Sequence, residues 1–301
     1  MRTWGSHVNH GLNIPEDMQL FHWYGINRAR TKAGQAVGVM ATDKDKEMED
    51  YQLLIDLHKS ANRQGPGGDA ETEMAVDMSM IDRSAPLKIA DIGCGTGAST
   101  LLLAQLLKAQ ITAVDFLQDF LEVLESRAEK MGLSDKVSTL CCSMDNLPFA
   151  DEEFDVIWSE GAIYNIGFER GVKDWNRYLK VGGLLVVSEI TWITDSRPSE
   201  LQKYWNDEYP EIDAASSKFG VLEKNGYSPI GYFVLPEHCW LENYYRPMQK
   251  SFKDFLNRNG NSEEARAIVE AENREIELYE KYKTHYSYGV YIARKSDQQK
   301  P

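Results

Sequence analysis

The sequence predicts an α/β protein built on a doubly wound sheet of seven strands, mostly parallel, with an antiparallel last strand. From residue 87 onward, short apolar segments alternate with longer segments of helical periodicity, which is the pattern of strands joined by crossover helices. The short segments are continuously apolar, as expected for parallel strands covered on both faces. A glycine-rich turn at 93–97 joins the first of these strands to a helix.

The predicted elements follow one another with few interruptions. A helix is expected over 43–58 and another around 74–81, with a sharp break at 64–68 where glycines and a proline cluster. The sheet and its first helices then follow. Strands are predicted at 87–92, 111–114, 137–141, 154–158 and 184–190, with helices at 98–107 and 117–131.

The end of the chain predicts a strand at 232–235, a charged helix at 263–283 and a final strand at 286–293. Polar and apolar residues alternate in the final strand, which favours an edge strand with one exposed face. Residues 295–301 are polar and are expected to form a frayed tail. Residues 1–39 show no persistent periodicity, so we expect a disordered or non-native extension, with the functional chain beginning at Met40.

Composition excludes several classes of protein. The 33 basic and 47 acidic residues give a formal charge of −14, which argues against nucleic acid as the main partner. No apolar run approaches the roughly 18 residues of a membrane span. Four cysteines without CxxC spacing favour neither a disulfide framework nor a zinc site. They indicate a reducing compartment, so we expect a cytoplasmic protein.

The strongest site signal is the sequence Asp91-Ile92-Gly93-Cys94-Gly95-Thr96-Gly97 between a strand and a helix. Glycines at such a turn allow the backbone to approach a ligand closely. Asp115 ends the next strand, where a carboxylate can accept both hydroxyl hydrogens of a ribose. Strand, glycine turn, helix, strand and acid in this order indicate an adenosine-type ligand.

The glycine turn also satisfies the dinucleotide fingerprint, so the ligand class depends on later features. Phe116 follows the ribose acid and is placed to lie against an adenine ring. Ser143, Met144 and Asp145 follow the third strand, where a polar group can reach the adenine amine.

With these features the chain resembles the class I S-adenosylmethionine-dependent methyltransferases, which have a Rossmann-like fold, and especially the branch related to ubiquinone and menaquinone biosynthesis. The resemblance covers about residues 60–192. It includes the run Trp158-Ser159-Glu160-Gly161-Ala162-Ile163-Tyr164-Asn165 and the segment Arg63-Gln64-Gly65-Pro66-Gly67, shared with bacterial members of unassigned substrate. The resemblance implies that the glycine turn faces the methionine part of the cofactor and that Asp115 binds ribose. It also implies that residues 192–248, which are rich in aromatic side chains, form a cap over the methyl acceptor.

Glu160 and Tyr164 are the candidate catalytic residues, and Glu160 is also a candidate for binding the cofactor. Arg63 and Gln64 are expected to reach the cofactor carboxylate. No metal site is predicted, because His238 and Cys239 have no further ligands nearby in the sequence. The predicted cofactor-binding residues are Arg63, Gln64, Asp91, Gly93, Gly95, Gly97, Asp115, Phe116, Ser143, Met144, Asp145 and Glu160.

The resemblance implies transfer of a methyl group from S-adenosylmethionine to a small acceptor, with release of S-adenosylhomocysteine. Two alternatives stay open on the sequence: an NAD-dependent oxidoreductase with a similar glycine turn, and a catalytically silent module that only binds S-adenosylmethionine. The sequence gives no indication of oligomeric state.

Overall fold

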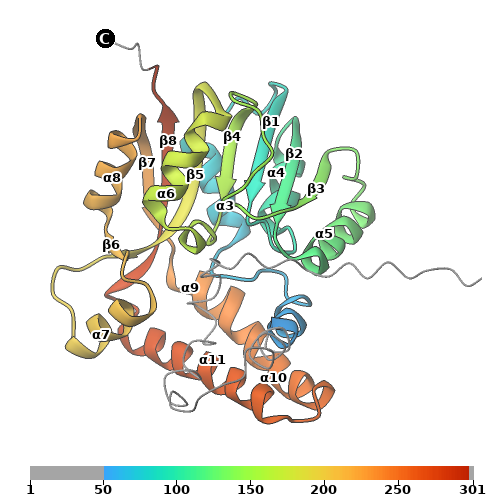
Figure 1. Ribbon diagram of the computed structural model, residues 1–301, viewed down its shortest axis with the longest axis vertical. Helices are drawn as coiled ribbons and strands as arrows, with labels where there is room; N and C mark the ends of the chain where they lie inside the picture. Colours follow the sequence, from blue (N-terminus) through green and yellow to red (C-terminus); the bar gives the residue numbers. More distant parts are fainter. Residues whose placement is uncertain (1–50, 298–301) are drawn as a thin grey trace, which may run out of the picture.

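The computed structural model describes residues 51–297 (Figure 1). The predicted extension over 1–39, the first part of the helix expected at 43–58 and the last four residues of the chain lie outside this range. Residues 51–58 are helical.

A single mixed sheet forms the centre of the molecule, with the strand order β3-β2-β1-β4-β5-β8-β7. Strands β1 to β5 are parallel, and β8 runs antiparallel to both of its neighbours. This confirms the predicted sheet, to which the two-residue strand β6 adds an eighth strand beside β5. The strands are β1 (Leu87–Ile92), β2 (Ala109–Asp115), β3 (Val137–Cys141), β4 (Phe154–Ser159), β5 (Leu179–Trp192), β6 (Asp213–Ala214), β7 (Tyr227–Val234) and β8 (Tyr286–Lys295).

The prediction that the last strand lies at an edge is wrong, because β8 lies between β5 and β7 and its first eight residues are buried. Its small alternating residues belong to the core rather than to an exposed face. Ser287 donates a hydrogen bond to the carbonyl of Leu235 (2.9 Å) and accepts one from the indole of Trp240 (2.9 Å). Residue 295 also belongs to the strand and not to the expected tail, since the Lys295 ammonium donates to two backbone carbonyls.

Helices cover both faces of the sheet. Successive residues of each strand point to opposite faces, and they enter two separate apolar clusters. One cluster includes α3, α4 and α5, and the other includes α6 and α8. The helices are α3 (Asp69–Ser79), α4 (Ala98–Leu106), α5 (Gln118–Lys130), α6 (Phe168–Trp175), α7 (Ser199–Glu208), α8 (Ala215–Lys224), α9 (Glu237–Trp240), α10 (Arg246–Arg258) and α11 (Glu263–Tyr282), with short helical turns η1 (Ile163–Asn165), η2 (Asn176–Tyr178) and η3 (Leu241–Tyr245).

A second layer of helices lies beyond one end of the sheet, with α10 and α11 running beneath the carboxyl ends of the parallel strands (Figure 1). Stacked aromatic rings join this layer to the sheet. Trp240 stacks on Tyr279 with ring centroids 4.4 Å apart and on Tyr288 at 5.3 Å. The interval 192–248 is divided between the two regions, because it includes β7 and α8 of the sheet as well as α9 and η3. Most of its aromatic side chains are buried in the core.

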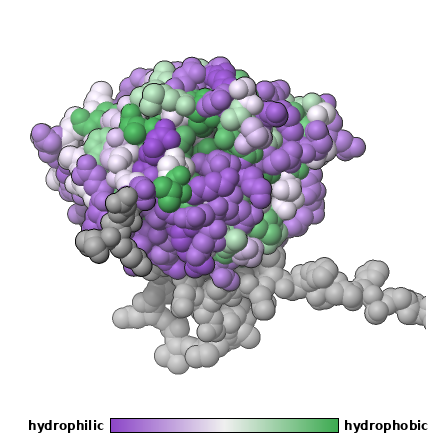
Figure 2. Space-filling view, turned by 90° about the horizontal axis from the view of Figure 1, so that it is seen from above, coloured by the Kyte–Doolittle hydropathy of each residue, from purple (hydrophilic) through white to green (hydrophobic). Residues whose placement is uncertain are grey.

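The face opposite this helical layer mixes hydrophilic and smaller hydrophobic areas (Figure 2). Within residues 51–297, none of the helices combines the length and the apolar composition that crossing a membrane requires.

Candidate active site

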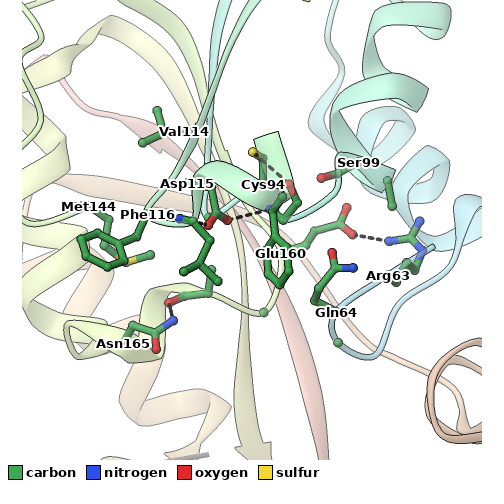
Figure 3. A pocket seen from close by; sticks show the side chains of 18 of the residues that line it. Arg63, Gln64, Cys94, Ser99, Val114, Asp115, Phe116, Met144, Glu160 and Asn165 are labelled. Carbon is green, nitrogen blue, oxygen red and sulfur yellow. Dashed lines mark hydrogen bonds and ion pairs between the residues drawn. The ribbon is translucent and has the colours of Figure 1, made fainter. Parts of the chain in front are cut away.

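A cavity opens at the carboxyl ends of β1, β2, β3 and β4. The chain leaves β1 toward β2 and β3 on one side and returns to β4 on the other, so β1 and β4 flank the switch point at which doubly wound sheets bind ligands. The cavity contains about 1020 Å³ of space, part of which is open solvent. Most of the predicted site residues line it (Figure 3): Arg63, Gln64, Gly93, Gly95, Asp115, Phe116, Ser143, Met144, Glu160 and Tyr164.

The glycine turn forms one wall of the cavity. Gly93 has φ +75°, and a Cβ atom there would lie 2.2 Å from the Cβ of Ala162. Any side chain at position 93 would therefore clash with the segment that follows β4. Gly97 does not line the cavity; it lies against Leu124 of α5 and allows α4 and α5 to pack closely.

Asp115 holds the turn from the other side. One carboxylate oxygen accepts the amide of Gly95 (2.8 Å) and the other accepts the amide of Leu117 (2.9 Å). A carboxylate has about four acceptor positions, so each oxygen can still accept a ligand hydroxyl. Burial raises the pKa of Asp115, while the amide hydrogen bonds from Leu117 and Gly95 act in the opposite direction.

Asp91 lies behind the turn and does not line the cavity. Its Oδ2 accepts hydrogen bonds from Ser99 (2.9 Å) and Thr100 (2.6 Å), both in the first turn of α4. The carboxyl group is fully buried. Burial raises its pKa to about 7, although the hydroxyls of Thr100 and Ser99 lower it. In this structure Asp91 supports the turn from behind.

The raised pKa of Asp91 predicts a dependence of stability on pH. A carboxyl with a higher pKa in the folded state stabilises the fold when it is protonated, and this contribution is lost as the pH rises from about 4 to about 7. Asp91→Asn removes the titration. We therefore expect the free energy of unfolding of the variant, relative to wild type, to increase by about 2–3 kcal/mol between about pH 5 and about pH 8. Urea unfolding of both proteins at both pH values measures this difference in the free energy of unfolding.

Asp135→Asn is the matched control for this experiment, because Asp135 is exposed on the turn before β3. The free energy of unfolding of this variant should change between the two pH values by the same amount as that of wild type. The same change for Asp91→Asn as well would contradict the assignment.

Glu160, directly after β4, is held by three donors. Its Oε1 accepts the hydroxyl of Thr72 (2.7 Å) and the indole of Trp158 (2.9 Å), and its Oε2 accepts Arg63 Nη1 (3.0 Å). Arg63 also pairs with Asp69 at 2.9 Å. The cavity wall therefore presents an arginine whose positive charge is already balanced by two carboxylates.

Gln64 connects the segment before α3 to the glycine turn. Its side-chain oxygen accepts the amide of Thr96 (2.8 Å), and its nitrogen donates to the carbonyls of His58 (3.2 Å) and Ala61 (3.3 Å). The absence of a side chain at Gly95 makes room for Gln64, because a Cβ at position 95 would lie 2.3 Å from Gln64 Oε1.

Phe116, Ser143 and Met144 line the other end of the cavity. Asp145, which the sequence places with them, lies outside the lining. Its carboxylate accepts the Ser143 hydroxyl (2.5 Å) and lies 3.5 Å from Arg170. In this structure Asp145 is a neighbour that orients Ser143.

Tyr164 lies in η1 and lines both this cavity and a smaller adjoining one, which has room for little more than a water molecule. Both cavities are lined by Gln64, Gly65, Pro66, Gly161 and Tyr164. The second is closed by residues of η3, α11 and β8, namely Tyr244, Glu272, Glu275 and Tyr288. Burial raises the pKa of the Tyr164 hydroxyl far above its ordinary value, with a smaller contribution from Glu275, so this side chain stays neutral.

Glu189 is a buried carboxylate that lies away from both cavities. It is fully buried in β5 with Lys218 Nζ 3.3 Å away. Lys218 also donates to the carbonyl of Glu211 (2.9 Å) and lies over the ring of Phe168. The pair is a structural feature of the fold.

Sequence reasoning missed several residues that line the first cavity. Tyr51 comes from the helix before the glycine break, and Phe120 from the first turn of α5. Both belong to apolar patterns that indicate only packing. Asn165 belongs to the run 158–165 that carries the family resemblance, but the sequence indicated no specific function for it.

The fold and the site together define the class of protein. Residues 90–187 match the family described as "Methyltransferase domain". The expected resemblance is thus confirmed.

Individual relatives agree with this class. Methyltransferase GfsG of Streptomyces halstedii is 33% identical over 111 residues, which are 36% of this chain and 40% of that protein. The demethylmenaquinone methyltransferase of Bacteroides fragilis is 33% identical over 108 residues, which are 35% of this chain and 44% of that protein. The chain thus matches less than half the length of either relative.

A solved structure extends the similarity to the fold as a whole. A SAM-dependent methyltransferase from Geobacter sulfurreducens, in complex with S-adenosyl-L-homocysteine, has a TM-score of 0.70 at 16% identity. The superposition covers 81% of this chain and 97% of that one.

Proposed function

We propose that the protein transfers a methyl group from S-adenosylmethionine to a small acceptor and releases S-adenosylhomocysteine. The observation that carries the proposal is the first cavity, where the glycine turn, Asp115 and Phe116 meet at the switch point of a methyltransferase domain. Asp115 would accept the ribose hydroxyls and Phe116 would lie against the adenine. The similar Geobacter sulfurreducens structure, a SAM-dependent methyltransferase in complex with S-adenosyl-L-homocysteine, supports the same cofactor.

The charges of the cavity favour a sulfonium cofactor over a dinucleotide. Among the described residues that line it, the charged side chains are Arg63, Asp115 and Glu160. Arg63 is paired with carboxylates, so it is not a surplus cation for a pyrophosphate. A net negative wall instead attracts the positive sulfur of S-adenosylmethionine.

The acceptor is proposed to bind beside the cofactor next to Tyr164, where the first cavity adjoins the second one. Tyr164 lines both spaces, and Glu272 and Glu275 on the far wall of the second one would attract an acceptor with hydrogen-bond donors or a positive charge. Methyl transfer to carbon, nitrogen, oxygen or sulfur is an in-line displacement on an activated sulfonium. The chief tasks of the protein are therefore to align two reactants and to exclude water.

The domain limits and the cellular setting are parts of the same proposal. The sequence places the methyltransferase domain at 40–294; we extend its end to Lys295, the last residue of β8, and assign the covering of the acceptor chiefly to η3 and α11. Four free cysteines support a reducing compartment such as the cytoplasm. The charge of −14 supports an acceptor other than nucleic acid.

Calorimetric titration with three ligands tests the cofactor class. We expect S-adenosylmethionine and S-adenosylhomocysteine to bind with micromolar dissociation constants (~8 kcal/mol), and NADH to give no measurable binding. Binding of NADH alone would favour an oxidoreductase. Tight binding of S-adenosylmethionine, without S-adenosylhomocysteine production across a panel of small amines, phenols and carboxylic acids, would favour a silent binding module.

A further inference from the structure

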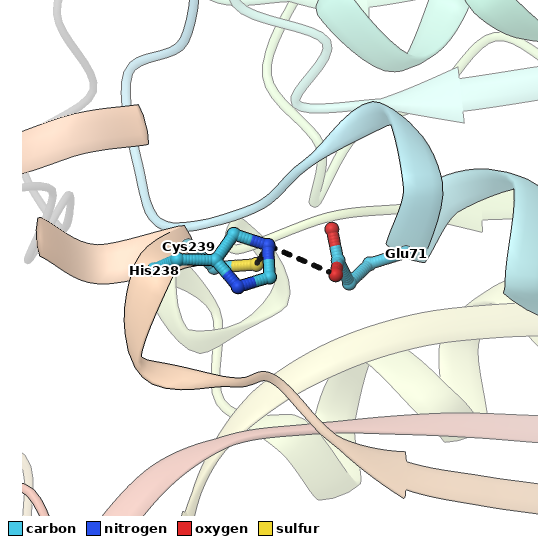
Figure 4. A group of neighbouring side chains, drawn as sticks. All are labelled: Glu71, His238 and Cys239. Carbon is cyan, nitrogen blue, oxygen red and sulfur yellow. Dashed lines mark hydrogen bonds and ion pairs between the residues drawn. The ribbon is translucent and has the colours of Figure 1, made fainter. Parts of the chain in front are cut away.

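A second cluster of ligand-type side chains lies outside both cavities, between the first turn of α3 and α9 (Figure 4). Glu71, His238 and Cys239 bring one carboxylate oxygen, one imidazole nitrogen and one sulfur within 4.8 Å of one another. The sequence placed His238 beside Cys239 but gave no sign of the third member, which comes from a helix 167 positions earlier.

The distances in this cluster suit a tetrahedral ion. His238 Nε2 lies 3.2 Å from Glu71 Oε1 and 3.8 Å from Cys239 Sγ. Zinc–ligand bonds of about 2.0–2.2 Å to nitrogen and oxygen and about 2.3 Å to sulfur imply separations of roughly 3.4 Å and 3.6 Å in a tetrahedron. Both observed distances agree with these values to within a few tenths of an ångström.

Burial and charge point to the same kind of ligand. Cys239 is fully buried and Glu71 is 7% exposed, so two of the three groups are already withdrawn from water. Glu71 Oε1 faces His238 Nε2 at 3.2 Å and the Cys239 sulfur lies near the same carboxylate, and a buried carboxylate is costly unless a cation or donors of this kind compensate it. The His238 side chain is half exposed and leaves the cluster open to solvent on one side.

We propose that Glu71, His238 and Cys239 form a Zn²⁺ site, with water as the fourth ligand on the exposed side. Binding forms a bond from zinc to each of the three side chains and breaks the S–H bond of Cys239, whose proton passes to solvent. One thiolate and one carboxylate then balance the two charges of the ion.

The ion would fix α9 to α3 near the cofactor cavity. The neighbouring segments are already joined, because the side-chain amide of Asn243 in η3 donates to the carbonyl of Gly67, just before α3 (2.8 Å). Thr72, the residue after Glu71, donates to Glu160. A zinc ion here would therefore stabilise the hydrogen bond from Thr72 to Glu160 without contacting the cofactor.

Metal titration of the full-length protein, after treatment with a chelator, tests the site. We expect one Zn²⁺ per chain, and one Co²⁺ with the sulfur-to-cobalt charge-transfer absorption of a bound thiolate and the intense visible bands of tetrahedral geometry. Cys239→Ser should abolish the charge-transfer absorption. His238→Ala, at a half-exposed position where folding should be unaffected, should weaken Zn²⁺ binding at least tenfold.

Two controls separate this site from adventitious metal binding. Cys141→Ala removes an exposed thiol, and His285→Ala removes a partly exposed imidazole, both outside the cluster. Each should leave the Zn²⁺ affinity and the Co²⁺ spectrum unchanged. The proposal is overturned if wild type binds no Zn²⁺, or if binding persists in His238→Ala and Cys239→Ser with unchanged affinity.

Discussion

Asp115→Asn should weaken the binding of S-adenosylmethionine and S-adenosylhomocysteine by about 10- to 100-fold. The substitution keeps the shape of the side chain but replaces one acceptor oxygen with a donor. Both oxygens already accept backbone amides, from Gly95 and Leu117, so the new NH₂ group must face one of these donors. A hydrogen bond to a charged group contributes about 1.5–3 kcal/mol, and the ribose loses at least one such acceptor. Calorimetric titration measures the change.

Asp119→Asn is the matched control for Asp115→Asn. Asp119 is exposed in the first turn of α5, four residues along the chain, and its substitution should leave both dissociation constants unchanged. Urea unfolding of both variants separates loss of binding from loss of folding. Unchanged affinity in a well-folded Asp115→Asn protein would remove the carboxylate from the site and reopen the choice of ligand.

The part of the site that the sequence predicted best lies within one strand–turn–helix–strand unit. The glycine turn after β1 and Asp115 at the end of β2 are separated by only one helix. Parallel neighbouring strands end at the same edge of a sheet, so their terminal residues must meet. The register of β1 with β2 then places Asp115 beside the turn, where its carboxylate accepts the amide of Gly95.

Other features depend on contacts that sequence pattern does not report. Tyr51 reaches the cavity from a segment before the sheet, and Glu71 meets Cys239 only because the fold brings the first turn of α3 near α9. The alternation of polar and apolar residues in β8 led to the wrong prediction of an edge strand. Ser287 and Gly289 interrupt the apolar residues because they are small and buried, not because they are exposed. A Cβ at Gly289 would lie 2.7 Å from the Tyr232 ring, so a polar-looking pattern here reflects close packing.

Gly97→Ala should lower the free energy of unfolding by about 2–5 kcal/mol. Gly97 has φ +88°, and a Cβ there would lie 2.1 Å from Leu124 Cδ1. The left-handed backbone conformation costs a non-glycine residue roughly 1–2 kcal/mol. Relieving the overlap must displace Leu124, which is fully buried, and overpacking of this kind costs about 1–3 kcal/mol. Urea unfolding measures the sum.

Gly132→Ala separates the two contributions. Gly132 also has positive φ, +68°, but a Cβ there would meet nothing within 4 Å. Its substitution should therefore cost only the backbone part, about 1–2 kcal/mol. The steric part can be removed independently, because Gly97→Ala should cost about the same as Gly132→Ala in a Leu124→Ala background. Equal losses for Gly97→Ala and Gly132→Ala in the wild-type background would show that Leu124 moves aside freely. In that case Gly97 would be needed for its backbone conformation alone.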